Sequence, residues 1–148
     1  MKGPGFDVDF FMKEALKQAH QAYNEGEVPV GAVVVCNEQI IAKSYNMTEK
    51  LQDVTAHAEI LAITSASQYL GSKYLTDCTI YVTLEPCIMC AGAIHWGQLH
   101  KIVYGANDEK RGYTNYSEKI LHNKTKVVAG IRKEECGELM TKFFKDKR

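Results

Sequence analysis

Two short motifs contain the residue types that bind transition metals. They are TAHAE at positions 55–59 and EPCIMC at positions 85–90. Cys87 and Cys90 are three positions apart, so within one helical turn both sulfur atoms lie on one face and can share a zinc ion. The first turn of a helix also favours the thiolate form, which is the form that zinc binds.

His57 completes a set of three protein ligands, the number typical of a catalytic zinc site, and leaves the fourth position for water. Glu59 does not share a helical face with His57, so we assign it a different task. A carboxylate beside the metal can take a proton from the attacking water and return it to a leaving group. His-x-Glu followed by Pro-Cys-x-x-Cys is typical of zinc-dependent nucleobase deaminases. We therefore predict one zinc ion per chain, with Glu59 as the catalytic residue.

Each motif alone also has a simpler interpretation. A CxxC pair can be a redox pair or two buried core thiols, and HxE is common by chance, although a thioredoxin-like site gives no reason for the His-x-Glu. A structural zinc site needs a fourth ligand. The remaining cysteines and histidines show no matching ligand spacing; they are Cys36, Cys78, Cys136, His20, His95, His100 and His122.

The elements that must position these motifs follow from hydrophobic spacing and turn residues. We predict helices at 9–25, 56–69, 86–96 and 134–145, and strands at 30–36, 39–45, 79–83, 102–104 and 127–131. Asp9 is the expected N-cap of the first helix, Asp53 or Thr55 that of the second, and Pro86 the first residue of the third. Gly26 and Gly71 are the expected helix stops.

Helices that alternate with strands after an initial hairpin predict an α/β fold. We expect a single domain over residues 1–148, with a mixed five-stranded sheet covered by helices on both faces. In such sheets, ligand sites favour the strand ends that lead into helices, and both metal motifs stand at such ends. Residues 105–125 carry no clear pattern.

Composition indicates an ordinary globular protein. The chain has 148 residues, 45% of them hydrophobic, with 18 basic and 18 acidic side chains. The amino terminus lacks an apolar leader and no long apolar run is present, so we expect a soluble, cytoplasmic protein without a membrane segment. Residues 1–100 carry 6 basic and 11 acidic side chains and residues 101–148 carry 12 and 7, which places the basic surplus late in the chain. That surplus is either an anion-binding surface or ordinary solvated lysines.

Three stretches resemble bacterial tRNA-specific adenosine deaminases. They are EVPVGA at 27–32, TAHAEI at 55–60 and YVTLEPCIMCAGAI at 81–94. The resemblance covers roughly residues 10–106 and returns in the closing helix at Glu135-Cys136 and Phe143-Phe144. It implies the three-layer cytidine deaminase fold, a homodimer, and conversion of adenosine to inosine at the wobble position of a tRNA anticodon stem-loop.

The resemblance also implies roles for individual residues. His57, Cys87 and Cys90 match the zinc ligands and Glu59 matches the proton shuttle. The expected substrate-binding residues are the base-binding Asn46, the apolar wall residues Val30 and Leu84, and Ala58. No organic cofactor is expected.

The chain departs from this family at 110–117, where KRGYTNYS replaces Lys-Thr-Gly followed by small residues and Ser. Tyr113 and Tyr116 beside Lys110 and Arg111 either stack on bases or tuck onto the core. Trp96 stands where a smaller or polar residue is expected, in a helix apolar enough to be buried in the core or at a dimer interface.

The terminal segment 143–148, with two phenylalanines and three cations, resembles the family's tRNA-contacting end. Two other functions remain open at this level. One is deamination of free guanine, cytosine or cytidine, because the metal motif alone cannot distinguish a base in an RNA loop from a free base. The other is a non-catalytic module stabilised by zinc, which would not need Glu59.

Overall fold

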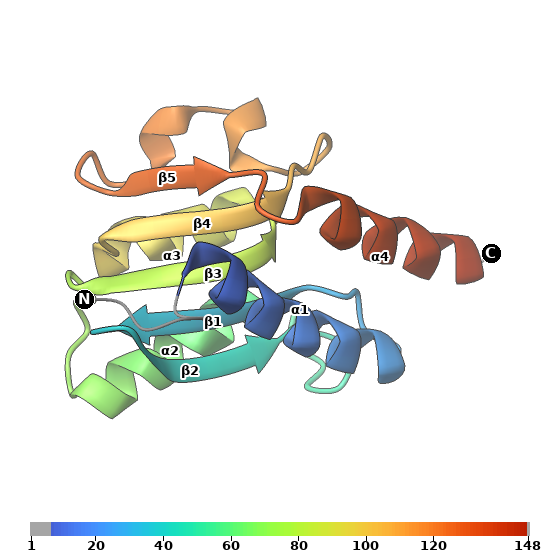
Figure 1. The fold of residues 1–148 in the computed structure, drawn as a ribbon, viewed down its shortest axis with the longest axis horizontal. Coiled ribbons are helices and arrows are strands. Elements are labelled where there is room, and N and C mark those ends of the chain that lie inside the picture. The colour runs from blue at the N-terminus through green and yellow to red at the C-terminus, as the bar shows by residue number, and fades with distance from the viewer. Residues whose placement is uncertain (1–6, 148) are drawn as a thin grey trace.

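A five-stranded sheet lies between two layers of helices. The computed structural model describes residues 7–147, so Arg148 and the first six residues, on which part of the leader expectation rests, lie outside it. The elements are α1 Val8–Asn24, β1 Gly31–Cys36, β2 Gln39–Tyr45, α2 Ala58–Leu70, β3 Cys78–Leu84, α3 Ile88–Gly97, β4 Lys101–Ala106, η1 Tyr113–Asn115, η2 Glu118–Ile120, β5 Lys126–Ala129 and α4 Lys133–Asp146. Helices α1 and α4 cover one face, and α2 and α3 the other (Figure 1).

The strand order is β2-β1-β3-β4-β5. β1 pairs antiparallel with β2 and β3, whereas β3, β4 and β5 run parallel, so the predicted mixed sheet is confirmed. Asn37 and Glu38 have φ of 53° and 62°, the left-handed backbone of a tight hairpin turn. The start of β1 and the ends of β2, β3 and β4 all lie at one edge of the sheet.

The start of α1 differs from the prediction by two positions. Asp7, not Asp9, is the N-cap, and its side chain accepts a hydrogen bond from the backbone N–H of Phe10 at 2.9 Å. Asp9 lies in the first turn and pairs with Arg132 at 2.8 Å, which links α1 to the start of α4. Either aspartate fits the hydrophobic spacing, so local pattern alone could not choose between them.

Helices α2 and α3, which cover the same face of the sheet, each begin directly after a residue of a type that binds metals. His57 is the N-cap of α2 and makes no side-chain capping bond, so neither predicted cap is correct. Thr55 donates to the Asp53 carboxylate within the preceding loop instead. Cys87 is the N-cap of α3, which places Pro86 one residue before the cap rather than at the first helical position.

Two apolar layers, one on each face of the sheet, form the core. Small residues of α2 and α3 pack on one face, and larger side chains of α1 together with Cys136 pack on the other. Gly31 allows α1 to lie directly against the start of β1, because a Cβ there would sit 2.1 Å from the backbone oxygen of Ala15. The start of β1 is therefore closely packed against α1.

The region without a predicted pattern contains the two short 3-10 helices, η1 and η2. Tyr113 is 2% exposed and belongs to the core, so it does not stack on bases, whereas Tyr116 is 64% exposed. Trp96 is 77% exposed, so this side chain is not part of the core, and its expected place at a dimer interface stays a prediction. Helix α3 buries only the face that carries Cys90, Ala91 and Ile94.

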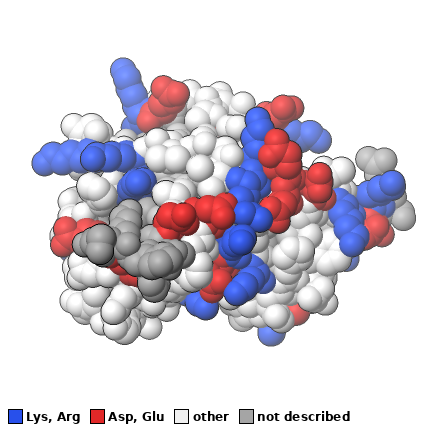
Figure 2. All heavy atoms as spheres, viewed as in Figure 1, with Lys and Arg blue, Asp and Glu red and all other residues white. Residues whose placement is uncertain are grey.

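Charged side chains of both signs mingle on the face that carries α1 and α4, and basic ones gather toward the end of α4 (Figure 2). Among residues 7–147, no helix combines the length and apolar character needed to cross a bilayer.

Candidate active site

His57, Cys87 and Cys90 converge between the starts of α2 and α3. The Nδ1 atom of His57 lies 3.6 Å from the Sγ atom of Cys87 and 3.4 Å from that of Cys90. One ligand atom from each residue falls within 4.8 Å of the others, which makes the three a group able to hold a metal ion. The structure thus brings together the three residues that spacing had singled out.

The three ligand groups influence one another electrostatically. A hydrogen bond from Cys90, together with one from His57, lowers the pKa of Cys87 to about 4, although burial acts in the opposite direction. The same hydrogen bond to Cys87, together with burial, raises the pKa of Cys90. The hydrogen bond to Cys87 also raises the pKa of His57. A cation that enters this group meets one thiolate directly and displaces protons from its neighbours.

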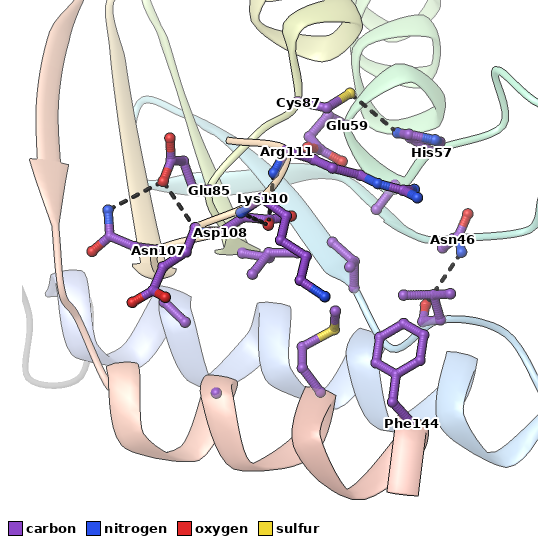
Figure 3. Close-up of a pocket in the computed structure, with 18 of the residues that line it drawn as sticks. Asn46, His57, Glu59, Glu85, Cys87, Asn107, Asp108, Lys110, Arg111 and Phe144 are labelled. Carbon is purple, nitrogen blue, oxygen red and sulfur yellow. Dashed lines mark hydrogen bonds between the residues drawn. The ribbon is translucent and has the colours of Figure 1, made fainter. Parts of the chain in front are cut away.

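Glu59 lies beside this group at the floor of a cavity (Figure 3). Its side chain is buried, with 4% of the residue exposed. Burial raises the pKa of Glu59 to about 7, with a further contribution from the charge of Cys87. A carboxyl group that titrates near neutral pH can both accept and return a proton, which suits general acid–base catalysis.

The cavity above Glu59 has a volume of about 740 Å³ and opens at the sheet edge where β2, β3 and β4 end. All four predicted substrate-binding residues line it, namely Asn46, Val30, Leu84 and Ala58. Asn46 is 6% exposed and follows β2 directly. Its Nδ2 atom donates to the carbonyl of Val28 at 3.3 Å, and its Oδ1 atom accepts from the backbone N–H of Thr48 at 3.4 Å. These bonds fix the orientation of the amide at the cavity wall.

Helix α4 forms a further wall of the cavity, of which the sequence singled out only Phe144. It contributes Gly137, Met140, Thr141 and Phe144. Phe144 rises from α4 toward the side of the cavity that Asn46 lines (Figure 3). Phe143, by contrast, is 7% exposed and packs against the Tyr23 ring of α1 at a centroid distance of 6.0 Å. The two phenylalanines that were expected to act together on RNA therefore have different environments.

The loop after β4 supplies the other side of the cavity mouth. Asn107, Asp108, Glu109, Lys110 and Arg111 all line it. Arg111 reaches toward His57, and Lys110 points into the space between the loop and α4 (Figure 3). The basic surplus of the last third of the chain thus contributes two cations to the cavity mouth.

Two buried carboxylates organise the loops around the cavity. Glu27 is 1% exposed, and its two oxygens accept from the backbone N–H groups of Glu49 at 3.0 Å and Lys50 at 2.7 Å. Glu85 is 3% exposed and accepts from the loop after β4. Burial raises the pKa of Glu85, but hydrogen bonds led by those from Thr114 lower it more, so the net shift is downward. Sequence reasoning missed both roles, because nothing in the spacing links either residue to its loop.

The remaining cysteines and histidines stay apart from this group. Among residues 7–147, His57, Cys87 and Cys90 are the only group of three or more ligand-type side chains close enough to share an ion. This agrees with the three-ligand site and gives no fourth protein ligand for a structural site.

Comparison with known proteins points in the same direction. A family model for MafB19-like deaminases matches residues 6–148. A tRNA-specific adenosine deaminase of Bacillus subtilis (strain 168) is 43% identical over 145 residues, which cover 95% of this chain and 90% of that protein. A structure from a study of A-to-I editing by tRNA deaminases at the wobble position superposes with a TM-score of 0.82 and 42% identity, over 87% of this chain and 97% of that one.

A guanine deaminase from Bacillus subtilis superposes less closely. Its TM-score is 0.66 and its identity 36%, over 79% of this chain and 72% of that chain. The chain is therefore similar to deaminases over nearly its whole length, and two of these relatives act on different bases.

Proposed function

The chain belongs to the MafB19-like deaminase family, and on this premise we propose that it hydrolyses adenosine to inosine at the wobble position of a tRNA anticodon. The observation that carries the proposal is one cavity with two different ends. At its floor, Glu59 lies beside the three side chains that could hold a metal ion. At its mouth lie Lys110, Arg111 and Phe144. A free base needs only the floor, whereas a nucleotide within RNA also presents phosphates and neighbouring bases to the mouth.

The metal we propose is one zinc ion per chain, held by His57, Cys87 and Cys90. Two thiols and one imidazole are ligands that zinc prefers, and their mutual distances suit a single small ion. When bound, such an ion polarises a water molecule and makes it nucleophilic at neutral pH. The net charge of the three ligand groups falls as their protons leave, which offsets the charge of the cation.

Glu59 moves the protons in the reaction we propose. It first takes a proton from the attacking water and passes it to N1 of the adenine ring while a C–O bond forms at C6. It then carries the second proton of that water to the exocyclic amine, and the C–N bond breaks to release ammonia. Adenosine and water are thereby converted to inosine and ammonia, and Glu59 returns to its starting state.

The base would be held between the cavity walls. The Asn46 amide can donate to and accept from the base, and its bonds to Val28 and Thr48 hold it in place before binding. Val30, Leu84 and Ala58 offer the apolar surface for the ring faces. We assign these roles on the basis of their position in the cavity and of the resemblance to the family.

We also propose a homodimer and a cytoplasmic location. The outer face of α3 leaves Trp96 77% and Ile88 49% exposed, which is unusual for side chains of this size. A second copy of the chain would cover that face. The five cysteines are all free among the described residues, which fits a reducing compartment.

The test is a deamination assay on two tRNAs that differ only at the wobble position. The wild type should form inosine from a tRNA with an ACG anticodon and should leave unchanged the same tRNA with guanosine at that position. Free guanine, cytosine and cytidine are assayed in parallel with ammonia release as the readout. Absence of inosine together with salt-independent turnover of a free base would refute the RNA assignment and establish the alternative, because RNA activity should fall steeply with salt. Zinc binding without any deamination would establish the structural module.

A further inference from the structure

The loop that carries Lys110 and Arg111 is held by a single buried carboxylate. The Oε1 atom of Glu85 accepts from Asn107 Nδ2 and from the backbone N–H of Asp108, both at 3.1 Å. Its Oε2 atom accepts from the backbone N–H of Thr114 at 3.0 Å and from the Thr114 hydroxyl at 2.7 Å. These four bonds use the full acceptor capacity of the carboxylate and tie both ends of the 107–114 loop to the end of β3.

Inside the loop a second set of bonds fixes the tip. The Oδ1 atom of Asp108 accepts from the backbone N–H groups of Lys110 at 3.1 Å and Arg111 at 3.0 Å. The backbone oxygen of Asp108 accepts from Gly112 N–H at 2.9 Å. The backbone of the two cationic residues is therefore set by Asp108, which Glu85 in turn holds.

Gly112 lies directly against the Glu85 carboxylate. A Cβ atom at Gly112 would lie 2.2 Å from the carboxyl carbon of Glu85, so only glycine lets the loop rest on the carboxylate. Tyr113 is buried in the core, and its backbone N–H donates to the carbonyl of Pro86 at 2.9 Å. The loop is thus anchored beneath its tip, while the side chains at the tip stay exposed.

We propose that the Glu85 carboxylate and the Thr114 hydroxyl are a positioning device that holds Lys110 and Arg111 over the cavity mouth, where both cations bind RNA phosphates next to the target nucleotide. Neither cation forms an ion pair within the part of the chain that the structure describes, so both are available to an anion. A cationic turn that is ordered before binding loses little entropy when phosphate arrives. This inference rests on the proposed RNA substrate and names the contacts that select it.

The test begins with Thr114→Val, which removes the hydroxyl donor and keeps the side-chain shape. We expect the KM for an anticodon stem-loop RNA to rise by about tenfold while kcat stays within about twofold of the wild type. Thr114→Ser keeps a hydroxyl and should restore the wild-type KM. Thr125→Val is the matched control, because its hydroxyl donates to the carbonyl of Leu99 at 2.6 Å at the opposite edge of the sheet. It should leave the KM unchanged.

A double-mutant cycle shows whether Thr114 acts through the two cations. In a Lys110→Ala, Arg111→Ala background, Thr114→Val should raise the KM no further, since the groups it positions are gone. Direct binding of a fluorescent anticodon stem-loop RNA, followed by anisotropy, supplies a second readout, and zinc content and thermal unfolding identify any variant that fails to fold.

Three outcomes would overturn the proposal. The first is an unchanged KM for Thr114→Val while the wild type remains active on RNA, which removes the positioning device and leaves the proposed function intact. The second is a Thr114→Val effect of equal size with and without the two cations. The third is a wild type that neither binds nor deaminates RNA, which removes the proposed function together with this inference.

Discussion

Replacing either of two adjacent phenylalanines of α4 by alanine should affect different properties: fold stability in one case and RNA binding in the other. Phe143 is 7% exposed and packs on Tyr23, while Phe144 is 49% exposed and lines the cavity. We expect Phe143→Ala to lower the stability of the fold and Phe144→Ala to weaken RNA binding. Each variant serves as the control for the other, because both replace a phenylalanine by alanine at adjacent positions of the same helix.

The magnitudes follow from burial. Truncation of a buried phenylalanine costs about 3–5 kcal/mol. Phe143 lies in the last turns of a terminal helix that can adjust, so we expect about 3 kcal/mol and a fall in Tm of about 6–12 °C. Phe144 already exposes half of its surface and its loss leaves no enclosed cavity, so the cost should be about 1 kcal/mol. Stacking of a base on an aromatic ring contributes about 1–3 kcal/mol, so the KM for RNA should rise by about fivefold or more.

The assay compares thermal unfolding by circular dichroism with the KM for an anticodon stem-loop RNA. Phe144→Tyr keeps the aromatic face and should retain a KM near that of the wild type. An equal fall in Tm for the two alanine variants would refute the different packing of the two rings. An unchanged KM for Phe144→Ala would refute the role of Phe144 as a wall of the RNA site.

Three other substitutions probe the catalytic group and the core. Glu59→Gln should lower kcat by about 10²–10⁴-fold with zinc content unchanged by metal analysis; loss of the metal instead would show that Glu59 is a ligand. Glu27→Gln replaces an acceptor of two backbone N–H groups with an amide and should cost about 2 kcal/mol by denaturant unfolding, whereas the same change at Glu49, whose side chain is exposed, should cost little. Burial raises the pKa of Cys78 and Cys136 to about 12 from 9.0, so these thiols lose their protons at lower pH in the unfolded chain than in the folded one. The free energy of unfolding should therefore fall as pH rises above about 9. For the Cys136→Ala variant, the free energy of unfolding should fall less steeply over the same pH range.

The metal group could be predicted from sequence because its geometry is local. Each ligand stands at the start of a helix, and the two helices follow strands that end at one edge of the sheet. Once the hairpin and the following elements are recognised, the fold places the starts of both helices, and therefore the three ligand residues, at the same end of the sheet. The N-cap of α1 shows the limit of local pattern, since two aspartates fit and only the pairing of Asp9 with Arg132 on α4 distinguishes them.

Helical spacing could also have predicted that Phe143 is buried and Phe144 is exposed. Cys136, Leu139, Met140 and Phe143 follow at intervals of three, one and three residues, which places Phe143 on the buried stripe and Phe144 to one side of it. The 107–114 loop offered no such signal. Its conformation depends on Glu85, a residue 22 to 29 positions earlier, and no periodicity relates the two.

The two buried carboxylates hold the loops around the cavity largely through backbone N–H groups. Glu27 accepts only from backbone N–H groups, and two of the four bonds to Glu85 also come from backbone N–H groups. Any residue except proline supplies such a donor, so a loop can change its side chains and keep these anchors. Within the 110–117 segment, Lys110 and Arg111 line the cavity mouth, Tyr113 lies in the core, and Gly112 rests against the Glu85 carboxylate. The Thr114 hydroxyl adds to this backbone frame a side-chain bond that sequence variation can remove or restore, which makes the hold on Lys110 and Arg111 adjustable without disturbing the metal group.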